Sequence, residues 1–185
     1  MGLKKTSREE ILQHSIKIFK INGYYNTSMA NIAGACGLIK GSIYHHFKSK
    51  EEIGLESLKY IHKYFEDNIY KIAYQDDLNQ KIRIQKFIQK IDDYFLNSEG
   101  GCLLGNLALE ISNENALFKD EIRKYFTNWE KALEHILACC YEQDKAIALS
   151  KKYVALTQGE IMMMTLYDSS ENYLKVGEKI ISLVK

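Results

Sequence analysis

Apolar residues recur along this chain every three to four positions, in segments separated by short stretches rich in Gly, Ser and Asn. This spacing is typical of amphipathic helices. The segments lie at roughly 7–22, 29–36, 39–46, 50–72, 84–95, 102–112, 116–142, 144–168 and 171–184. The 185-residue chain contains no Pro, which favours long uninterrupted helices. The pattern therefore predicts an all-α protein of about nine helices.

The start of the first helix is marked by a capping box that can be read in two registers, Thr6 with Glu9 or Ser7 with Glu10. Gly23 is expected to end this helix.

The segment 19–53 predicts two short helices joined by a tight glycine turn. Thr27 and Ser28 are candidate N-caps of the first. Gly37 is expected to end it, because glycine enters the left-handed conformation without strain. Its buried stripe is expected to consist of Met29, Ile32, Ala33 and Cys36. The second short helix, about 39–46, carries a further apolar line of Ile39, Ile43 and Phe47.

The opposite face of this second helix is polar and carries Lys40, Ser42 and His45. A helix this short, with such a face, must serve something other than core packing. A helix-turn-helix requires this combination, because one helix enters the major groove while neighbouring groups grip phosphate. The pattern therefore predicts a DNA-binding motif.

The same residues resemble the DNA-binding region of the tetracycline-repressor-like (TetR) family of bacterial regulators. The matching positions are Phe19, Gly23, Tyr24, Thr27, Ser28, Ile32, Ala33, Gly37, Lys40, Gly41, Ser42, Tyr44, His45, Phe47, Ser49, Lys50 and Glu51. The family usually has a small or hydroxylic residue where Ile39 stands, and Ile39 can neither cap the helix nor bond a phosphate. The resemblance implies a DNA-binding head at 1–48 and a helical ligand-binding and dimerisation body at 49–185.

Each expected DNA contact has a role. Lys40 and Ser42 are candidates for contacts to base edges, and Gly41 lets the backbone approach DNA. The other candidate DNA-binding residues, mostly phosphate contacts that set register rather than sequence, are Thr27, Ser28, Tyr44, His45 and Lys50.

Charge is distributed unevenly along the chain. Residues 1–50 hold eight Lys or Arg and two Glu, a net charge of +6, so the remaining residues carry −5 within a total of +1. A basic first quarter attached to an acidic remainder indicates that the first part meets a polyanion. A solvated amphipathic face explains the charge alone equally well, and the helix-turn-helix pattern favours DNA.

The body is rich in aromatic residues and Met, most of which a helical bundle uses as core. Taken together, they also make an apolar effector pocket plausible, and the resemblance implies one between the middle helices. The candidate ligand-binding residues are Phe65, Phe87, Tyr94, Cys102, Asn106, Phe126, Trp129 and Met163.

Cys102 follows Gly100 and Gly101 at the start of a predicted helix, where the amide dipoles favour a thiolate. Some TetR-like proteins with a similar Gly-Cys-Leu segment respond to electrophiles, so the resemblance makes a sensing thiol one interpretation. The other, which we favour, is a small apolar residue in a tight turn.

Other classes of function find little support. The four Cys lack CxxC spacing and the five His are scattered, so we expect no metal site, no cofactor and no enzyme. We find no long apolar run and no signal peptide, so we expect a cytoplasmic protein without a membrane partner.

The sequence thus predicts a ligand-responsive transcriptional regulator, a repressor that binds a palindromic double-stranded DNA operator and is released by a small apolar or electrophilic effector. One helix-turn-helix makes too few contacts for tight binding, which favours a homodimer. The resemblance implies that the last two long helices form the dimer interface. The alternative is a helical protein-interaction module whose helix-turn-helix no longer binds DNA.

Overall fold

The protein is described by a computed structural model covering residues 6–111 and 113–184. Within these ranges the elements are α1 (Arg8–Asn22), α2 (Met29–Ala35), α3 (Lys40–Tyr44), α4 (Lys50–Phe65), the π-helix η1 (Glu66–Tyr70), α5 (Lys71–Ala73), α6 (Gln80–Leu96), α7 (Leu103–Glu110), α8 (Ala116–Leu137), α9 (Gln143–Tyr167) and α10 (Glu171–Ile181). Because α4, η1 and α5 are consecutive, they form one long helix. The prediction of an all-α chain of about nine helices is confirmed for the described residues. The predicted helix end near Ser112 lies outside them.

The described residues fall into two compact units. The first takes those from 6–61 and 103–122, and the second those from 62–102 and 123–184. The sequence predicts that the DNA-binding domain ends between residues 48 and 49, and this boundary stays a prediction. The packing units differ from it because α7 packs against α1 within the first unit.

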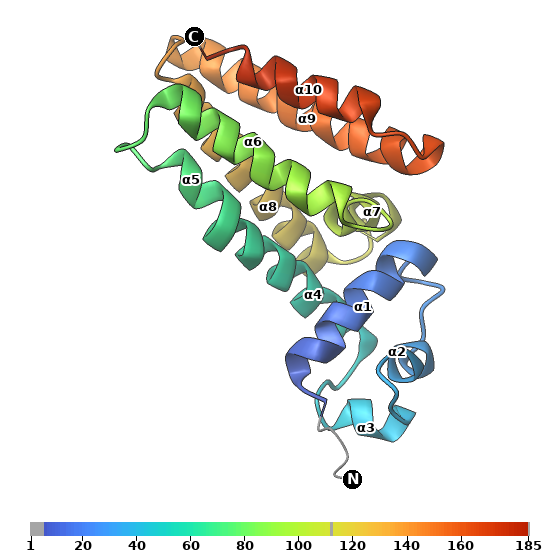
Figure 1. Ribbon diagram of the computed structural model, residues 1–185. Coiled ribbons are helices and arrows are strands. Elements are labelled where there is room, and N and C mark those ends of the chain that lie inside the picture. Colours follow the sequence, from blue (N-terminus) through green and yellow to red (C-terminus); the bar gives the residue numbers. More distant parts are fainter. Residues whose placement is uncertain (1–5, 112, 185) are drawn as a thin grey trace. The chain divides into compact units, whose positions relative to one another are not determined.

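In the first unit, α2 packs against both α1 and α3, as Figure 1 shows. Of the two registers for the capping box of α1, the one that forms is Ser7 with Glu10. The Glu10 amide donates to Ser7 Oγ at 3.1 Å, and the Ser7 amide donates to Glu10 Oε2 at 2.9 Å. Gly23 ends α1 with a φ of 79°. Ser28 caps α2, accepting from the Asn31 amide at 3.2 Å.

The predicted apolar lines of this unit are buried, with two exceptions: Cys36 is only half-buried, and Ile39 is exposed. Ile43 and Phe47 are buried as expected, but the Ile39 side chain is 77% exposed. The placement of Ile39 on the buried face of the second short helix was therefore wrong. Ile39 is the N-cap of α3 and has an extended backbone, so its side chain does not follow the helical spacing of the residues after it.

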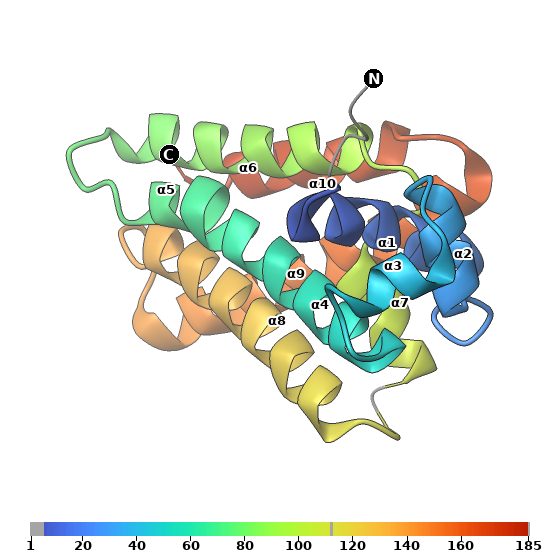
Figure 2. The same ribbon diagram turned by 90° about the horizontal axis from the view of Figure 1, so that it is seen from below.

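In the second unit, α10 packs against α9 and α6, and the three run side by side in Figure 1. Figure 2 shows α8 running along η1 and α5. This contact includes a hydrogen bond of 3.1 Å from the Tyr70 hydroxyl to the backbone carbonyl of Tyr125. The apolar lines predicted for the two helices across 50–95 are buried: Leu58, Ile61, Phe65, Ile69, Ile72, Ile84, Phe87, Ile88, Ile91 and Phe95. No described helix combines the length and apolar character that crossing a membrane would require.

Candidate DNA-binding surface and effector cavity

The outer face of α3 is exposed, and it carries the residues that the sequence singled out. Lys40, Gly41 and His45 are exposed, Tyr44 is 48% exposed, and Ser42 is half-buried. Ile43, between them, is fully buried and holds the helix on the unit. The geometry leaves a cationic, hydroxylic and aromatic face available to a ligand.

The C-terminal end of α3 is held by Arg8, which sequence reasoning missed. Its guanidinium lies 3.9 Å from the centre of the Phe47 ring, donates to the His46 carbonyl, and pairs with Glu52 at 3.0 Å. Glu52 also accepts from the Lys48 amide at 2.7 Å. Both hydrogen bonds lower the pKa of the Glu52 carboxyl. The one from the Lys48 amide has the larger effect, and the one from Arg8 comes second. No local signal predicts this cluster, because Arg8 lies 38 residues from His46 in the sequence.

Three other candidate contacts have roles within the unit. Thr27 is 1% exposed and its hydroxyl donates to the Gly23 carbonyl at 2.7 Å, which stabilises the turn between α1 and α2. Ser28 is exposed and caps α2. Lys50 Nζ donates to the Tyr24 carbonyl at 2.8 Å, and burial lowers the pKa of this amine.

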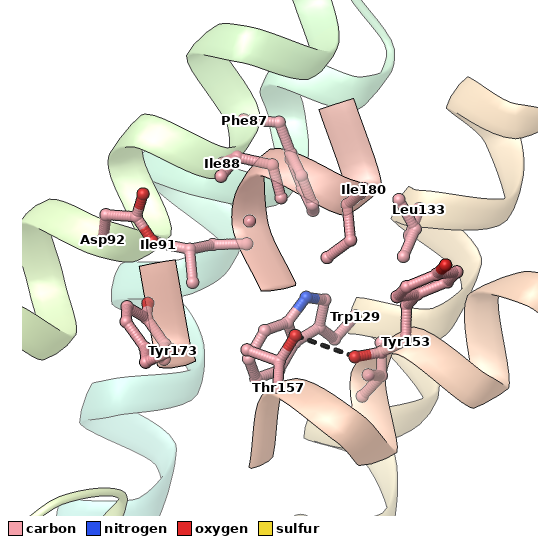
Figure 3. A pocket seen from close by; sticks show the side chains of 12 residues that line it. Phe87, Ile88, Ile91, Asp92, Trp129, Leu133, Tyr153, Thr157, Tyr173 and Ile180 are labelled. Atoms are coloured by element: carbon pink, nitrogen blue, oxygen red, sulfur yellow. Dashed lines mark hydrogen bonds between the residues drawn. The ribbon is translucent and has the colours of Figure 1, made fainter. Parts of the chain in front are cut away.

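Figure 3 shows a narrow apolar cavity in the second unit, between α6, α8, α9 and α10. It is almost filled by side chains. The centre of a water-sized sphere can occupy only about 10 Å³ of it, which is room for about one water molecule. Its lining residues are Phe87, Ile88, Ile91, Asp92, Trp129, Leu133, Tyr153, Val154, Thr157, Tyr173, Gly177 and Ile180.

The cavity has one ionisable pair at its wall. Burial raises the pKa of Asp92, and its interaction with the Tyr173 hydroxyl partly offsets that effect. Burial and the neighbouring Asp92 carboxylate both raise the pKa of Tyr173. Thr157 is also in the wall, and its hydroxyl donates to the Tyr153 carbonyl at 2.7 Å. The cavity therefore offers an apolar interior with a few polar groups at its wall, which suits a small apolar ligand.

The structure brings some of the predicted ligand-binding residues together. Phe87 and Trp129 line the cavity. Trp129 continues into an aromatic cluster, with ring centres 6.0 Å from Phe65 and 6.5 Å from Phe126, and Tyr94 lies 4.8 Å from Phe65.

The remaining predicted ligand residues lie elsewhere. Asn106 is exposed on α7 in the first unit, and Met163 is 38% exposed on α9. Cys102 is only 3% exposed. Its neighbours include the hydroxyls of Tyr70 and Tyr125, both buried, and burial raises the pKa of each phenol. An inaccessible thiol matches the interpretation of Cys102 as a packing residue.

Sequence reasoning missed four polar residues of the cavity wall: Asp92, Tyr153, Thr157 and Tyr173. They come from three different helices. Their convergence depends on how these helices pack, which periodicity within one helix does not give.

A second depression in this unit is an open groove of about 310 Å³ beside η1. Its lining contains Glu66, Lys71 and Lys131 together with Tyr70, Tyr74 and Asn128. Charged groups line the groove and it is open to solvent, so it suits an apolar effector less well than the narrow apolar cavity does.

The fold and the α3 surface define a helix-turn-helix DNA-binding protein with a helical body. Comparison with known proteins agrees. Residues 11–56 match the tetR family of bacterial regulatory proteins, and residues 82–179 match the C-terminal domain of LmrA/YxaF-like transcriptional regulators. The chain belongs to the TetR family of bacterial transcriptional regulators, with an LmrA/YxaF-like C-terminal domain. It is a regulator and not an enzyme.

Individual relatives match along their full length. The uncharacterised HTH-type regulator YxaF of Bacillus subtilis is 30% identical, over 100% of this chain and 98% of its own length. The regulator LmrA of the same organism is 27% identical, over 97% of each chain. The crystal structure of a TetR regulator from Legionella pneumophila superposes with a TM-score of 0.87 at 25% identity, covering 99% of this chain and 100% of that one.

Proposed function

We propose that this regulator is a homodimeric repressor that binds a palindromic operator and is released by a small apolar effector. The observation that carries the DNA-binding part is the outer face of α3, where Lys40, Tyr44 and His45 are exposed beside a buried Ile43. Lys40 and Ser42 contact base edges, and Gly41 allows the backbone to approach the groove.

Phosphate contacts come from the residues around this helix, namely Tyr44, His45, Lys50 and the α2 cap residue Ser28. Thr27 is left out of this set because its side chain is buried and its hydroxyl is bonded within the turn. Lys50 attracts phosphate through its charge and not through a direct hydrogen bond, since its amine already donates to the Tyr24 carbonyl.

The homodimer is supported by apolar residues left on the surface of α9. Leu166 and Tyr167 are 66% and 67% exposed, and Met162 is 57% exposed. Ala155 and Gly159, on the same helix, are small enough to allow a second helix close approach. Pairing through these helices places two recognition helices on one operator, and their spacing must match one turn of DNA, roughly 34–36 Å.

The effector site proposed here is the narrow cavity between α6, α8, α9 and α10. Its apolar interior favours a small apolar molecule, with Asp92, Thr157 and Tyr173 as the polar contacts. The effector releases DNA by stabilising a body conformation in which the two heads no longer match the operator. An electrophilic effector is disfavoured, because the Cys102 thiol is buried.

The experiment that tests DNA binding is a fluorescence anisotropy titration with a duplex selected by the protein from a random-sequence library. We expect affinity to fall steeply between two salt concentrations, because phosphate binding releases counterions. Adding candidate apolar effectors to the complex should then release the duplex. A protein that selects no duplex would contradict the proposal.

The alternative function, a protein-interaction module, is favoured by one observation. Ile39 exposes 77% of an apolar side chain at the start of α3, where a DNA-facing helix usually has a small or hydroxylic residue. Under that function, the titration would give weak binding without sequence preference.

A further inference from the structure

The turn between α1 and α2 is held by a carboxylate from a distant part of the sequence. The Tyr24 amide donates to Glu110 Oε2 at 2.9 Å, and the Tyr25 amide donates to Glu110 Oε1 at 2.7 Å. Both oxygens of one carboxylate therefore accept from consecutive backbone amides. Hydrogen bonds to a charged group are about twice as strong as neutral ones.

The conformation of the turn prepares this contact. Gly23 precedes the two amides with a φ of 79°, a value that residues with a Cβ rarely adopt. A Cβ at this position would lie 3.2 Å from Glu110 Oε1. Successive amides turned to the same side form a concave site for an anion, and the Glu110 side chain fills it.

The position of Glu110 in its own helix does not explain its presence. It is the last residue of α7, where the helix dipole presents its negative end. A carboxylate at this end is unfavourable, because it meets the negative end of the helix dipole. The bonds to the turn offset this cost, so the interaction that accounts for Glu110 is the one with the head.

The other side of the same turn is held as well. Lys50 Nζ donates to the Tyr24 carbonyl at 2.8 Å. The Tyr24 ring packs between Phe19 and Phe118, with ring centres 5.4 Å from each. The turn is therefore fixed by its amides, its carbonyl and its side chain, and it leads through Ser28 directly into α2 and α3.

We propose that Glu110 is a positioning residue through which α7 sets the helix-turn-helix for operator recognition. Fixing the α1–α2 turn fixes where α2 starts, and hence where α3 presents Lys40 and Tyr44. The inference rests on the proposed function, because it requires that α3 reads an operator.

The test compares the full-length variants E110Q and E114Q with the wild type. E110Q keeps the size of the side chain, but it replaces one accepting oxygen with an amide NH2 group, a donor that faces a donating backbone N–H. Glu114 is the matched control. The Glu114 carboxylate accepts from the Tyr25 hydroxyl and not from the turn amides. E114Q removes one negative charge, as E110Q does. The probes are the duplex selected by the wild type and a random duplex of equal length.

For E110Q we expect affinity for the selected duplex to fall at least roughly tenfold, in line with the loss of a charged hydrogen bond. On the random duplex, E110Q and E114Q should have the same affinity and the same dependence of affinity on salt, because the phosphate-binding groups are unchanged. A loss of folded protein would instead lower both affinities by the same factor.

The inference would be overturned if E110Q and E114Q had the same ratio of affinities for the selected and the random duplex. If E110Q fails to fold, hydrogen exchange in the wild type decides, since Tyr24 and Tyr25 amides exchanging at the rate of an unstructured chain would also overturn it. Failure of the proposed function is distinguishable from either result, because the wild type would then select no duplex.

Discussion

Neighbouring residues of similar chemistry have different tasks in this protein, and burial distinguishes them. Thr27 and Ser28 both carry a hydroxyl at the end of the α1–α2 turn. Thr27 is buried and bonds back to Gly23, whereas Ser28 is exposed and caps α2. The sequence identified both as candidate caps, but Ser28 is the N-cap, and the Thr27 hydroxyl bonds within the turn instead.

At the recognition helix, K40A and Y44A should both weaken binding to the selected duplex, because both side chains are exposed on the outer face of α3. K40A also removes a cation, so it should reduce the salt slope by up to roughly one. Y44A removes no charge and should leave the slope unchanged. Anisotropy titrations at several salt concentrations measure both quantities.

The control for these variants is K63A, an exposed lysine on α4 that pairs with Asp67 at 2.9 Å in the second unit. It should bind the duplex like the wild type. Unchanged affinity in both K40A and Y44A would contradict the assignment of α3 as the recognition helix.

Two helical glycines of the first unit allow a matched test of packing. A Cβ at Gly54 would lie 2.6 Å from a ring atom of Phe118 and 3.0 Å from one of Tyr24. G54A should therefore destabilise the protein by about 1–3 kcal/mol, as overpacking does. At Gly34 a Cβ would meet no atom of the described chain within 4 Å. G34A should stabilise the protein by roughly 0.5–1 kcal/mol.

Denaturant unfolding of the two alanine variants measures the difference. A G54A variant as stable as G34A would show that Phe118 can move aside without cost.

At the scale of elements, helical periodicity predicts the buried faces well, because each face depends only on residues three and four apart. The π-helical turn η1 escapes such reasoning, since Ile69 and Ile72 continue the same apolar line through it. The two contacts that hold the head also escape it. Arg8 reaches across 44 residues to Glu52, and Glu110 reaches across 86 to Tyr24. For the same reason, only two of the eight predicted ligand residues, Phe87 and Trp129, line the cavity.

The junction between α3 and α4 should be sensitive to acid. The folded-state pKa of Glu52 is lowered, first by the Lys48 amide and then by Arg8. Its carboxylate therefore stabilises the fold above the unfolded pKa, about 4.3. This contribution should be lost as the pH falls from that value through the lower folded-state pKa. E52Q should accordingly show a flatter dependence of stability on pH below about 5.

Unfolding midpoints between pH 7 and pH 3 test this expectation, with E56Q as the control because the Glu56 carboxylate pairs with the exposed Lys59 at 3.1 Å. If the E52Q and wild-type profiles stay parallel throughout, the cluster contributes nothing to acid stability.

At the scale of the whole molecule, packing within a single chain does not explain the apolar residues on the surface of α9. Apolar residues lie on all sides of this helix. Some are buried in the unit, such as Val154 and Ile161, while Leu166 and Tyr167 remain two-thirds exposed. Exposed apolar patches of this kind mark interfaces.

L166E should convert the proposed dimer into a folded monomer and abolish tight binding to a palindromic duplex, because a buried charge without a partner is costly at an apolar interface. Sedimentation measures the mass at micromolar concentration. L117E is the matched control, since Leu117 is 58% exposed at the start of α8. A wild-type protein that sediments as a monomer would contradict the dimer, and so would an L166E variant that remains dimeric.

If the cavity between α6, α8, α9 and α10 is the effector site, as proposed above, its tight packing limits how quickly an effector can bind. Space for about one water molecule means that an effector has nowhere to bind until Trp129 and its neighbours have moved apart. Entry must then wait for a rare opening of the core. In stopped-flow experiments, the observed rate should therefore rise with effector concentration only until it reaches the rate of opening, and then level off. The packing density of the free protein would thus set the maximum rate at which an effector can release the DNA.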